Sequence, residues 1–398
     1  MLTNLHIRNF KSLRDVTIAP GLVTVLIGEN GCGKSNFLEA IAMAGAGIGE
    51  KLDNEFLVSR GIRVTEPPFM RSAFTPQDEP ISVDLCYGAD RASLRLNHDN
   101  TGPDFGWTNL KLRDDEDLPG RPSLTTQVNE QGKLSVRVWD GAGLARELEL
   151  TDMEEVGRLL EELWNHRKDY GERLRPLTHY VIYSPENTAL RTFEVEGQIQ
   201  PLGIKGEGLF KLLKSLSGDA ERIAEIKENL RLIDWFADFK LPTVLAPYER
   251  HLEIRDRYIG AADGGEAGYF DQRSANEGFL FLLFYFTLFI SPDTPKLFAI
   301  DNIDASLNPK LCTEVMRRLT ALAQKHGKQV LITTHNPAVL DGLNLHDDEQ
   351  RLFTVRRSST GETKLRRVSA PKSLAGEAPV KLSEAFSRGL LGGLPQNF

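Results

Sequence analysis

Eight consecutive residues near the N-terminus have the types and spacing of a phosphate-binding loop. Gly28 to Ser35 read GENGCGKS, with two glycines five positions apart followed by lysine and serine. The apolar run LVTVLIG before the loop is typical of a buried strand, and residues 35–44 after it are predicted to form a helix. Glycines let backbone N–H groups converge on phosphate oxygens, and a helix N-terminus favours negative charge. The loop therefore predicts a nucleotide-binding site.

The side chains of this loop have separate expected roles. Lys34 is expected to reach the β- and γ-phosphates, and the Ser35 hydroxyl to bind Mg²⁺. A glycine turn with an incidental lysine is the alternative, and the flanking strand and helix disfavour it. The residues predicted to contact the nucleotide run through the loop and one position beyond it: Gly28, Glu29, Asn30, Gly31, Cys32, Gly33, Lys34, Ser35 and Asn36.

Two buried strands later in the chain are also predicted to end in polar groups. The segment LFAIDNID, residues 297–304, contains Asp301, whose carboxylate at the edge of a sheet is a Mg²⁺ ligand candidate beside Ser35. The segment LITTH, residues 331–335, ends in His335, which can hydrogen-bond a γ-phosphate. Taken alone, each residue is more often structural. The phosphate loop in the same chain reverses that weighting for Asp301.

An α/β fold is needed to bring these side chains together. From residue 273 onward, helix and strand patterns alternate, which predicts a parallel sheet with right-handed crossovers, closed by a hairpin and a helix over residues 382–391. The region before residue 99 reads as a β-rich lobe. Residues 99–123 are dense in Gly, Pro and Asp and predict a surface loop or an insertion boundary. An amphipathic helix over residues 152–174, closed by Pro176, a strand over HYVIYSP and a helical block over residues 208–237 follow.

Composition narrows the classes of protein. The 398 residues are 40% hydrophobic and 26% charged, as in an ordinary globular protein of about two or three domains. A net charge of −8 disfavours nucleic-acid binding by the whole surface, although a local basic groove can sit on an acidic protein. The three cysteines are sparse and form no CxxC pair, which predicts a cytoplasmic setting without disulfides or a zinc site. The longest apolar run, residues 279–290, is well short of the roughly 20 residues that span a bilayer, so no membrane contact is expected.

With these motifs in place, the sequence resembles the split ATP-binding-cassette head of the SMC, RecF and OLD-type ATPases. The resemblance is carried by IRNFKSL, GENGCGKSN, SANEG, FAIDNIDASLNP and TTHNPAVLDGL, and it is closest to AAA-type ATPases of bacterial anti-phage defence and toxin–antitoxin loci. It covers about the first 50 and the last 130 residues. It implies an ABC-type head with a mainly parallel sheet and a β-rich lobe, interrupted by a mixed α+β insertion. The implied parts are residues 1–98, 99–250 and 251–398.

The resemblance also assigns roles by position. Gly28 to Ser35 would be the Walker A loop, Asp301 the Walker B aspartate, residues 304–309 the D-loop and His335 the switch histidine. Ser274 and Gly278 lie in the signature segment, which in this family contacts the γ-phosphate bound by a second subunit. Two ATP molecules, each with Mg²⁺, would then lie between two paired heads, so self-association is expected.

Two departures from the family pattern affect the expected chemistry. Asn302 stands where the family has a glutamate, and an amide orients water but cannot accept its proton. Hydrolysis is therefore expected to be slow, or to use another acid such as Asp304 or Glu277, and the catalytic candidates are Asn302, Asp304 and His335. The signature SANEG lacks two adjacent glycines, so Gly278 is the stronger contact candidate. No glutamine loop is placed, and Gln77 is the nearest candidate.

The leading functional hypothesis is an ATP-dependent switch that controls a separate effector, a toxin or nuclease, in anti-phage defence. OLD-type relatives carry a nuclease domain after the histidine motif, and the 63 residues after His335 are too few for one. The alternatives are a DNA-repair or chromosome-maintenance ATPase that binds duplex DNA, and an ATP-binding scaffold that scarcely hydrolyses. A transporter subunit is disfavoured because about 240 residues separate Lys34 from Ser274. The basic C-terminal segment RRSSTGETKLRR is either a phosphate contact or a solvated hairpin face.

Overall fold

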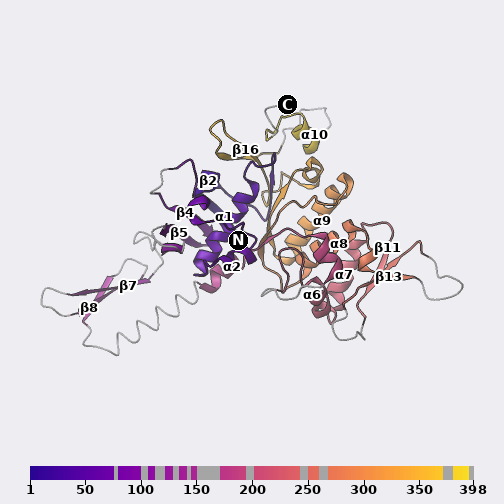
Figure 1. Ribbon diagram of the computed structural model, residues 1–398, viewed down its shortest axis with the longest axis horizontal. Helices are drawn as coiled ribbons and strands as arrows, with labels where there is room; N and C mark the ends of the chain where they lie inside the picture. The colour runs from indigo at the N-terminus through magenta and orange to yellow at the C-terminus, as the bar shows by residue number, and fades with distance from the viewer. Residues whose placement is uncertain are drawn as a thin grey trace.

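The computed structural model describes most of the 398-residue chain. In Figure 1 the N-terminal elements, drawn in indigo and purple, lie on one side of the molecule, and helices α6 to α9 lie on the other, with β16 and α10 at the top. The described residues are 1–75, 79–99, 106–112, 122–128, 134–140, 145–149, 171–193, 201–242, 250–259, 268–370 and 380–393.

A six-stranded sheet joins the two sides. Its order is β10-β14-β15-β3-β16-β17, and all neighbours run parallel except β16 and β17, which form a hairpin. The predicted parallel sheet and closing hairpin are therefore confirmed. The strands are β3 (Val23–Ile27), β10 (Ile182–Tyr183), β14 (Leu297–Ile300), β15 (Gln329–Thr334), β16 (Gln350–Arg357) and β17 (Thr363–Val368).

The register of this sheet places the polar groups at one edge. Ile300 pairs with Ile332, and Ile27 pairs with Thr334, so β14, β15 and β3 end side by side. Parallel strands share their carboxyl edge, and the residue after each strand faces the same region. The phosphate loop, Asp301 and His335 follow these three strands directly.

A second, antiparallel sheet covers the N-terminal side in the order β2-β1-β4-β5-β6. It contains β6, which lies inside the segment predicted to be a surface loop or an insertion boundary, so the loop prediction is wrong for these residues and the boundary stays a prediction. Pairing with β5 satisfies backbone groups of β5 that would otherwise form a sheet edge. The strands are β1 (Leu2–Phe10), β2 (Leu13–Ile18), β4 (Ile81–Tyr87), β5 (Asp90–Asp99) and β6 (Gly106–Leu112).

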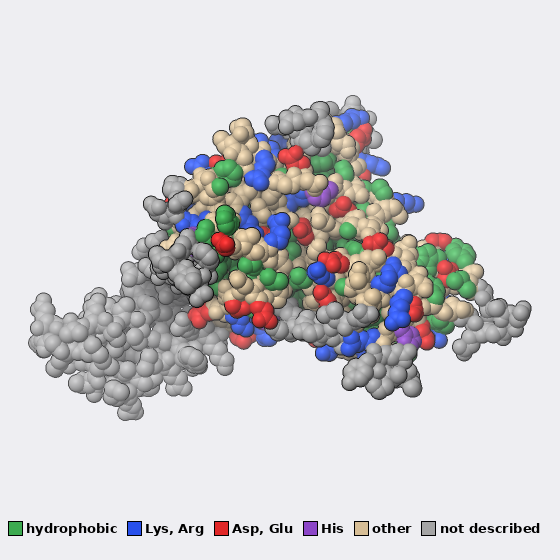
Figure 2. Space-filling model, in the orientation of Figure 1, with side chains coloured by type: hydrophobic (Ala, Val, Ile, Leu, Met, Phe, Trp, Pro, Cys, Tyr) green, Lys and Arg blue, Asp and Glu red, His purple; other side chains and the backbone are tan. Residues whose placement is uncertain are grey.

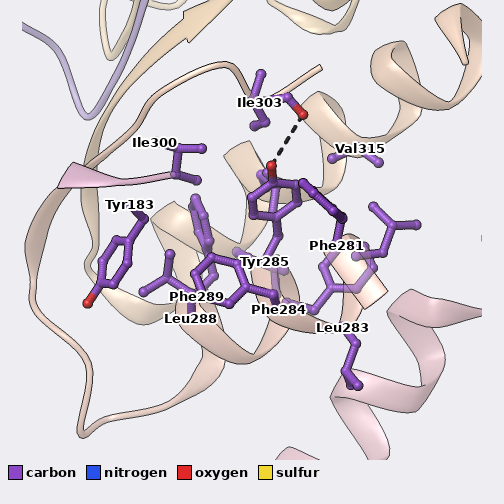
Figure 3. Packing of buried hydrophobic residues seen from close by; sticks show 14 of the residues in the cluster. Tyr183, Phe281, Leu283, Phe284, Tyr285, Leu288, Phe289, Ile300, Ile303 and Val315 are labelled. Carbon is purple, nitrogen blue, oxygen red and sulfur yellow. Dashed lines mark hydrogen bonds between the residues drawn. The ribbon is translucent and has the colours of Figure 1, made fainter. Parts of the chain in front are cut away.

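Two apolar cores lie on the two faces of the central sheet. On one face α1 (Lys34–Ile48) packs between the two sheets, in a core that includes Leu26 and Leu331. On the other face α8 (Glu277–Ile290) and α9 (Pro309–His326) share a core with Val25 and Ile332. Because successive side chains of a strand point to opposite faces, the same strands supply both cores. Figure 3 shows the aromatic packing of the second core around α8.

The remaining elements are short and surround this frame. Two small sheets have the orders β11-β12-β13 and β7-β8-β9. Within the described part of the chain, no helix is both long and apolar enough to cross a membrane. The elements are α2 (Asn54–Ser59), α3 (Pro67–Met70), β7 (Pro122–Val128), β8 (Leu134–Asp140), β9 (Ala145–Glu149), α5 (Asn187–Thr192), α6 (Leu209–Leu216), α7 (Ala220–Leu230), β11 (Phe236–Lys240), β12 (Glu253–Asp256), β13 (Tyr269–Asp271), η2 (Gln272–Ser274), η3 (Pro337–Gly342) and α10 (Leu382–Ser387).

The middle of the chain shows two differences from expectation. Of the predicted helix over residues 152–174, residues 152–170 lie outside the described part. Residues 171–178 are helical, so Pro176 does not end the helix. The strand predicted at HYVIYSP is β10, which pairs with β14, so residues of the expected insertion 99–250 contribute to the central sheet. The division of the chain into three parts stays a prediction.

Candidate nucleotide-binding site

The phosphate loop connects β3 to α1, and its glycines are required by its backbone. Gly31 and Gly33 have φ angles of 73° and 106°, in the left-handed region that side-chain-bearing residues rarely adopt. A Cβ on Gly28 would lie 2.0 Å from the carbonyl oxygen of Val355. The first glycine therefore allows the loop to pack against β16, and the later two allow it to turn into α1.

The β16–β17 hairpin holds the loop from outside. Thr363 donates its hydroxyl to the Cys32 carbonyl at 2.7 Å, and Arg357 donates Nε–H to the Gly31 carbonyl at 2.9 Å. A Cβ on Gly33 would lie 2.1 Å from Thr363 Oγ1, so no larger residue fits there. The basic C-terminal hairpin is thus not only a solvated face, because Arg357 contacts the loop.

Lys34 and His335 meet beside this loop. Lys34 is 6% exposed, and its Nζ donates to the carbonyls of Gly28 and Glu29, both at 2.9 Å. Its Nζ lies 3.4 Å from His335 Nδ1. Burial lowers the pKa of Lys34, and burial together with the Lys34 charge lowers the pKa of His335. His335 is therefore a neutral imidazole near pH 7, and it lines the cavity over the loop.

Ser35 and Asp301 also meet, as the metal prediction requires. The Ser35 hydroxyl donates to Asp301 Oδ2 at 2.9 Å, and the Thr333 hydroxyl donates to Asp301 Oδ1. A hydroxyl and a carboxylate in contact are oxygen ligands of the kind that Mg²⁺ takes together with substrate phosphates and water. Among the described residues, no group of three or more His, Cys, Asp or Glu side chains could hold a metal. Ser35 and Asp301 fit a Mg²⁺ whose remaining ligands would be phosphate oxygens and water.

The turn after Asp301 carries two of the catalytic candidates. Asn302 has a φ of 56°, and its backbone N–H donates to Thr333 Oγ1 at 2.9 Å. Asp304 Oδ1 accepts from the Thr334 hydroxyl at 2.6 Å and from the backbone N–H of His335 at 3.3 Å. Asp304 thus ties the turn to the end of β15, and one of its oxygens is already engaged twice.

A polar cavity of about 380 Å³ lies over the loop and is open to one side. It brings together most of the residues predicted from sequence, together with Arg357 of the basic C-terminal segment and with Arg63, which was not predicted. The lining residues are Asn30, Gly31, Gly33, Lys34, Ser35, Asn36, Arg63, Asn302, His335 and Arg357.

A second cavity, of about 180 Å³, adjoins the first through Ser35 and Arg63 and reaches Asp301 from the β10 side. It is also lined by Glu39 and by Glu186, which forms an ion pair with Lys205 at 3.0 Å. Arg63 is held in place by Glu39, at 2.6 Å, and by the side-chain oxygen of Asn36, at 2.9 Å.

Glu39, Glu186 and Arg63 were not among the residues predicted from the sequence. Glu186 follows β10, so a polar residue just after a predicted buried strand was the available indication. Arg63 lies in no recognisable pattern. Gln77 lies outside the described residues, and the strand next to Asp301 is followed by Ser184 and Glu186 rather than by glutamine.

The signature residues lie away from the chain's own phosphate loop. Ser274 is exposed at the end of η2 and lines a separate groove with Trp235, Ile259 and Phe270. Figure 2 shows apolar side chains gathered near β11 and β13 at the right of this view. Gly278 is buried in the first turn of α8. Neither residue lines the two cavities around Ser35, so their contact with a second subunit stays a prediction.

The fold and the site define a P-loop ATPase, and the families to which the chain is similar agree. Residues 155–341 match the family described as "AAA domain, putative AbiEii toxin, Type IV TA system", and residues 1–58 match the family described as "AAA ATPase domain". Together the two segments take in more than half of the chain. The two matched segments are therefore similar to AAA-type ATPase domains. No curated protein matches the sequence.

Solved structures of SMC heads share the fold. An SMC head bound to the C-terminal winged-helix domain of ScpA is 15% identical with a TM-score of 0.50, covering 92% of this chain and 98% of that chain. The SMC head of Thermotoga maritima is 14% identical with a TM-score of 0.42, covering 92% and 99%. A Pyrococcus furiosus Smc head with an extended coiled coil, bound to the C-terminal domain of ScpA, is 13% identical with a TM-score of 0.48, covering 92% and 96%. At this identity, the first of these likenesses supports the fold alone, which is that of an SMC-like α/β head.

Proposed function

We propose that this protein is an ATP-binding and ATP-hydrolysing switch whose heads pair around ATP and which controls a separate effector protein. The observation that carries the proposal is the double contact at one sheet edge. Ser35 meets Asp301 at 2.9 Å, and Lys34 meets His335 at 3.4 Å, although each pair is more than 260 residues apart in sequence. A glycine loop with both contacts provides a lysine for the phosphates of ATP and a hydroxyl and a carboxylate for Mg²⁺.

The residues of the site have separate proposed roles in binding and hydrolysing ATP. Backbone N–H groups of the loop, Lys34 and Arg63 hold the triphosphate and offset its charge. Ser35 and Asp301 would hold Mg²⁺, which would offset charge on the β- and γ-phosphates. Neutral His335 hydrogen-bonds a γ-phosphate oxygen. Asn302 orients the attacking water but cannot take its proton.

The missing base is the reason to propose a switch with a long-lived ATP state. Asp304 Oδ1 already accepts hydrogen bonds from the Thr334 hydroxyl and the His335 backbone N–H, which tie this carboxylate to the end of β15. Glu186 is a half-exposed acid that lines the second cavity, and its side chain forms an ion pair with Lys205. With no carboxylate placed as the family places it, hydrolysis is slow and the ATP-bound form persists.

A separate effector is supported by the family and by the chemistry of the chain. The matched family's description names a toxin and a type IV toxin–antitoxin system, in which a partner protein is expected. One of the solved SMC heads is bound to the C-terminal winged-helix domain of ScpA, which supports a head of this shape as a docking platform. We place the protein in the cytoplasm, in anti-phage defence. Duplex DNA is the alternative partner, and a salt-sensitive affinity that requires ATP would favour it.

The test is steady-state ATP hydrolysis by the full chain, with molecular mass measured in the presence and absence of Mg·ATP. Lys34→Ala is the loop variant, and Lys310→Ala, on an exposed part of α9, is the matched control. The proposal expects slow turnover and a doubled mass with ATP in the wild type and the control, and neither in Lys34→Ala. Equal turnover by Lys34→Ala and the wild type would overturn it.

A further inference from the structure

Helix α8 has one buried polar side chain whose hydrogen bond goes to a residue outside the helix. Every residue from Gly278 to Ile290 is buried, and only Tyr285 and Thr287 in that run have polar side chains. The Thr287 hydroxyl donates to Leu283 O at 2.7 Å, within its own helix. The Tyr285 hydroxyl donates instead to the carbonyl of Ile303 at 3.4 Å, as Figure 3 shows.

Packing alone does not account for this tyrosine. The same helix fills the core with phenylalanine at five positions, all of them buried: Phe279, Phe281, Phe284, Phe286 and Phe289. A buried hydroxyl destabilises the folded state unless it is hydrogen-bonded. Tyr285 is fully buried, and burial raises the pKa of its hydroxyl, so the group stays protonated as a donor. The bond to Ile303 is therefore what this hydroxyl contributes.

The acceptor lies in the turn that carries the catalytic candidates. Ile303 stands between Asn302 and Asp304, and its own N–H donates to the Thr333 carbonyl at 3.1 Å. Asn302 and Ser306 have φ angles of 56° and 60°, in the left-handed region. Residues in that region keep their conformation only where the surroundings hold them. On one side the end of β15 holds this turn, and on the other side Tyr285 does.

The start of α8 contacts the far end of the same turn. A Cβ on Gly278 would lie 3.3 Å from the carbonyl oxygen of Ser306 and 3.8 Å from Leu307 Cδ2. Tyr285 is seven residues further on, or about two helical turns. The helix therefore touches the turn at two separated points, near Ile303 and near Ser306.

We propose that Tyr285 is a positioning residue that fixes the turn carrying Asn302 and Asp304, and that through it α8 couples the signature segment to the site of the same chain. The coupling rests on the proposed pairing of heads, in which Gly278 meets the nucleotide of a second copy. A movement of α8 at Gly278 is passed to the turn through Ser306 and Ile303. Contact with a second head then sets the position of Asn302.

The first test is hydrogen exchange at the amides of residues 302–307 in the full chain without nucleotide. Tyr285→Phe keeps the ring and removes only the hydroxyl, and Thr287→Val removes a hydroxyl from the same helix that does not reach the turn. We expect exchange in the turn to quicken about 2- to 10-fold in Tyr285→Phe, and not in Thr287→Val. Equal exchange in Tyr285→Phe and the wild type would overturn the positioning role.

The second test measures specific ATPase activity against protein concentration, with molecular mass recorded at each point. Wild type and Thr287→Val are expected to become more active per chain as heads pair. Tyr285→Phe is expected to bind ATP and pair equally well but to lose that rise. A full rise in Tyr285→Phe would overturn the coupling. A wild type that neither hydrolyses nor pairs would instead refute the proposed function, and the exchange measurement would still decide the positioning role.

Discussion

Replacing Asn302 with glutamate should speed ATP hydrolysis while weakening the fold. Asn302 lines the cavity beside His335 and Lys34, where a carboxylate could accept the proton of the attacking water. A positioned general base contributes about 10²- to 10⁴-fold, or roughly 3–5 kcal/mol off the barrier. The residue sits at a φ of 56°, which asparagine tolerates better than glutamate. A left-handed residue with a longer side chain costs about 1–2 kcal/mol, so unfolding should need less urea.

The assay is phosphate release under saturating Mg·ATP, together with a urea unfolding curve. Asn302→Gln is the control, because it has the length and the backbone penalty of glutamate without a basic carboxylate. We expect Asn302→Glu alone to raise kcat, and both variants to lose stability. If Asn302→Glu turns over no faster than Asn302→Gln, the reasoning that a missing base limits hydrolysis is refuted.

Three further predictions follow from the site and its support. Because the pKa of His335 lies below its usual 6.5, activity that needs the neutral imidazole should persist as pH falls to 6.5 and decline below it; a midpoint above pH 6.5 would contradict this. Thr363→Val should weaken binding of a fluorescent ATP analogue about 3- to 10-fold, since it loses the 2.7 Å bond to Cys32 that braces the loop, whereas unchanged affinity would count against that bracing. Lys328→Met should lower the free energy of unfolding in urea by about 1–3 kcal/mol, because buried Lys328 donates to the carbonyls of Ser291 and Thr294 at 2.9 and 2.8 Å; no loss would show that those carbonyls find other partners.

The site residues that could be predicted from the sequence are those that directly follow a buried strand. The phosphate loop, Asp301 and His335 each follow a buried strand, and parallel strands bring their carboxyl ends to one edge. The alternation of strands and helices in the sequence therefore predicts that these residues lie close together, without any information on side-chain packing. The central sheet and its closing hairpin follow from the same pattern.

Residues that reach the site through tertiary contacts are not predicted by the order of strands and helices in the sequence. Arg63 is aimed by Glu39 and Asn36 on α1, and the bond from Thr333 to Asp301 joins neighbouring strands. Neither arrangement has a local spacing to recognise. The strand β6 was not predicted because it is short and lies between stretches rich in glycine, proline and aspartate. The partner-facing roles of Ser274 and Gly278 need a second molecule and remain predictions.

The place of β3 in the central sheet has a consequence for synthesis of the chain. The strand that leads into the phosphate loop is flanked by β15 and β16, and the loop is braced by Thr363, which follows Cys32 by 331 residues. An emerging N-terminal segment thus lacks both neighbours of its central strand, and contacts so distant in sequence form slowly. The ribosome must deliver the chain as far as β17 before the loop has both neighbouring strands and its contact with Thr363. A fragment truncated by premature termination would then carry the complete loop motif and still be unable to act as a switch.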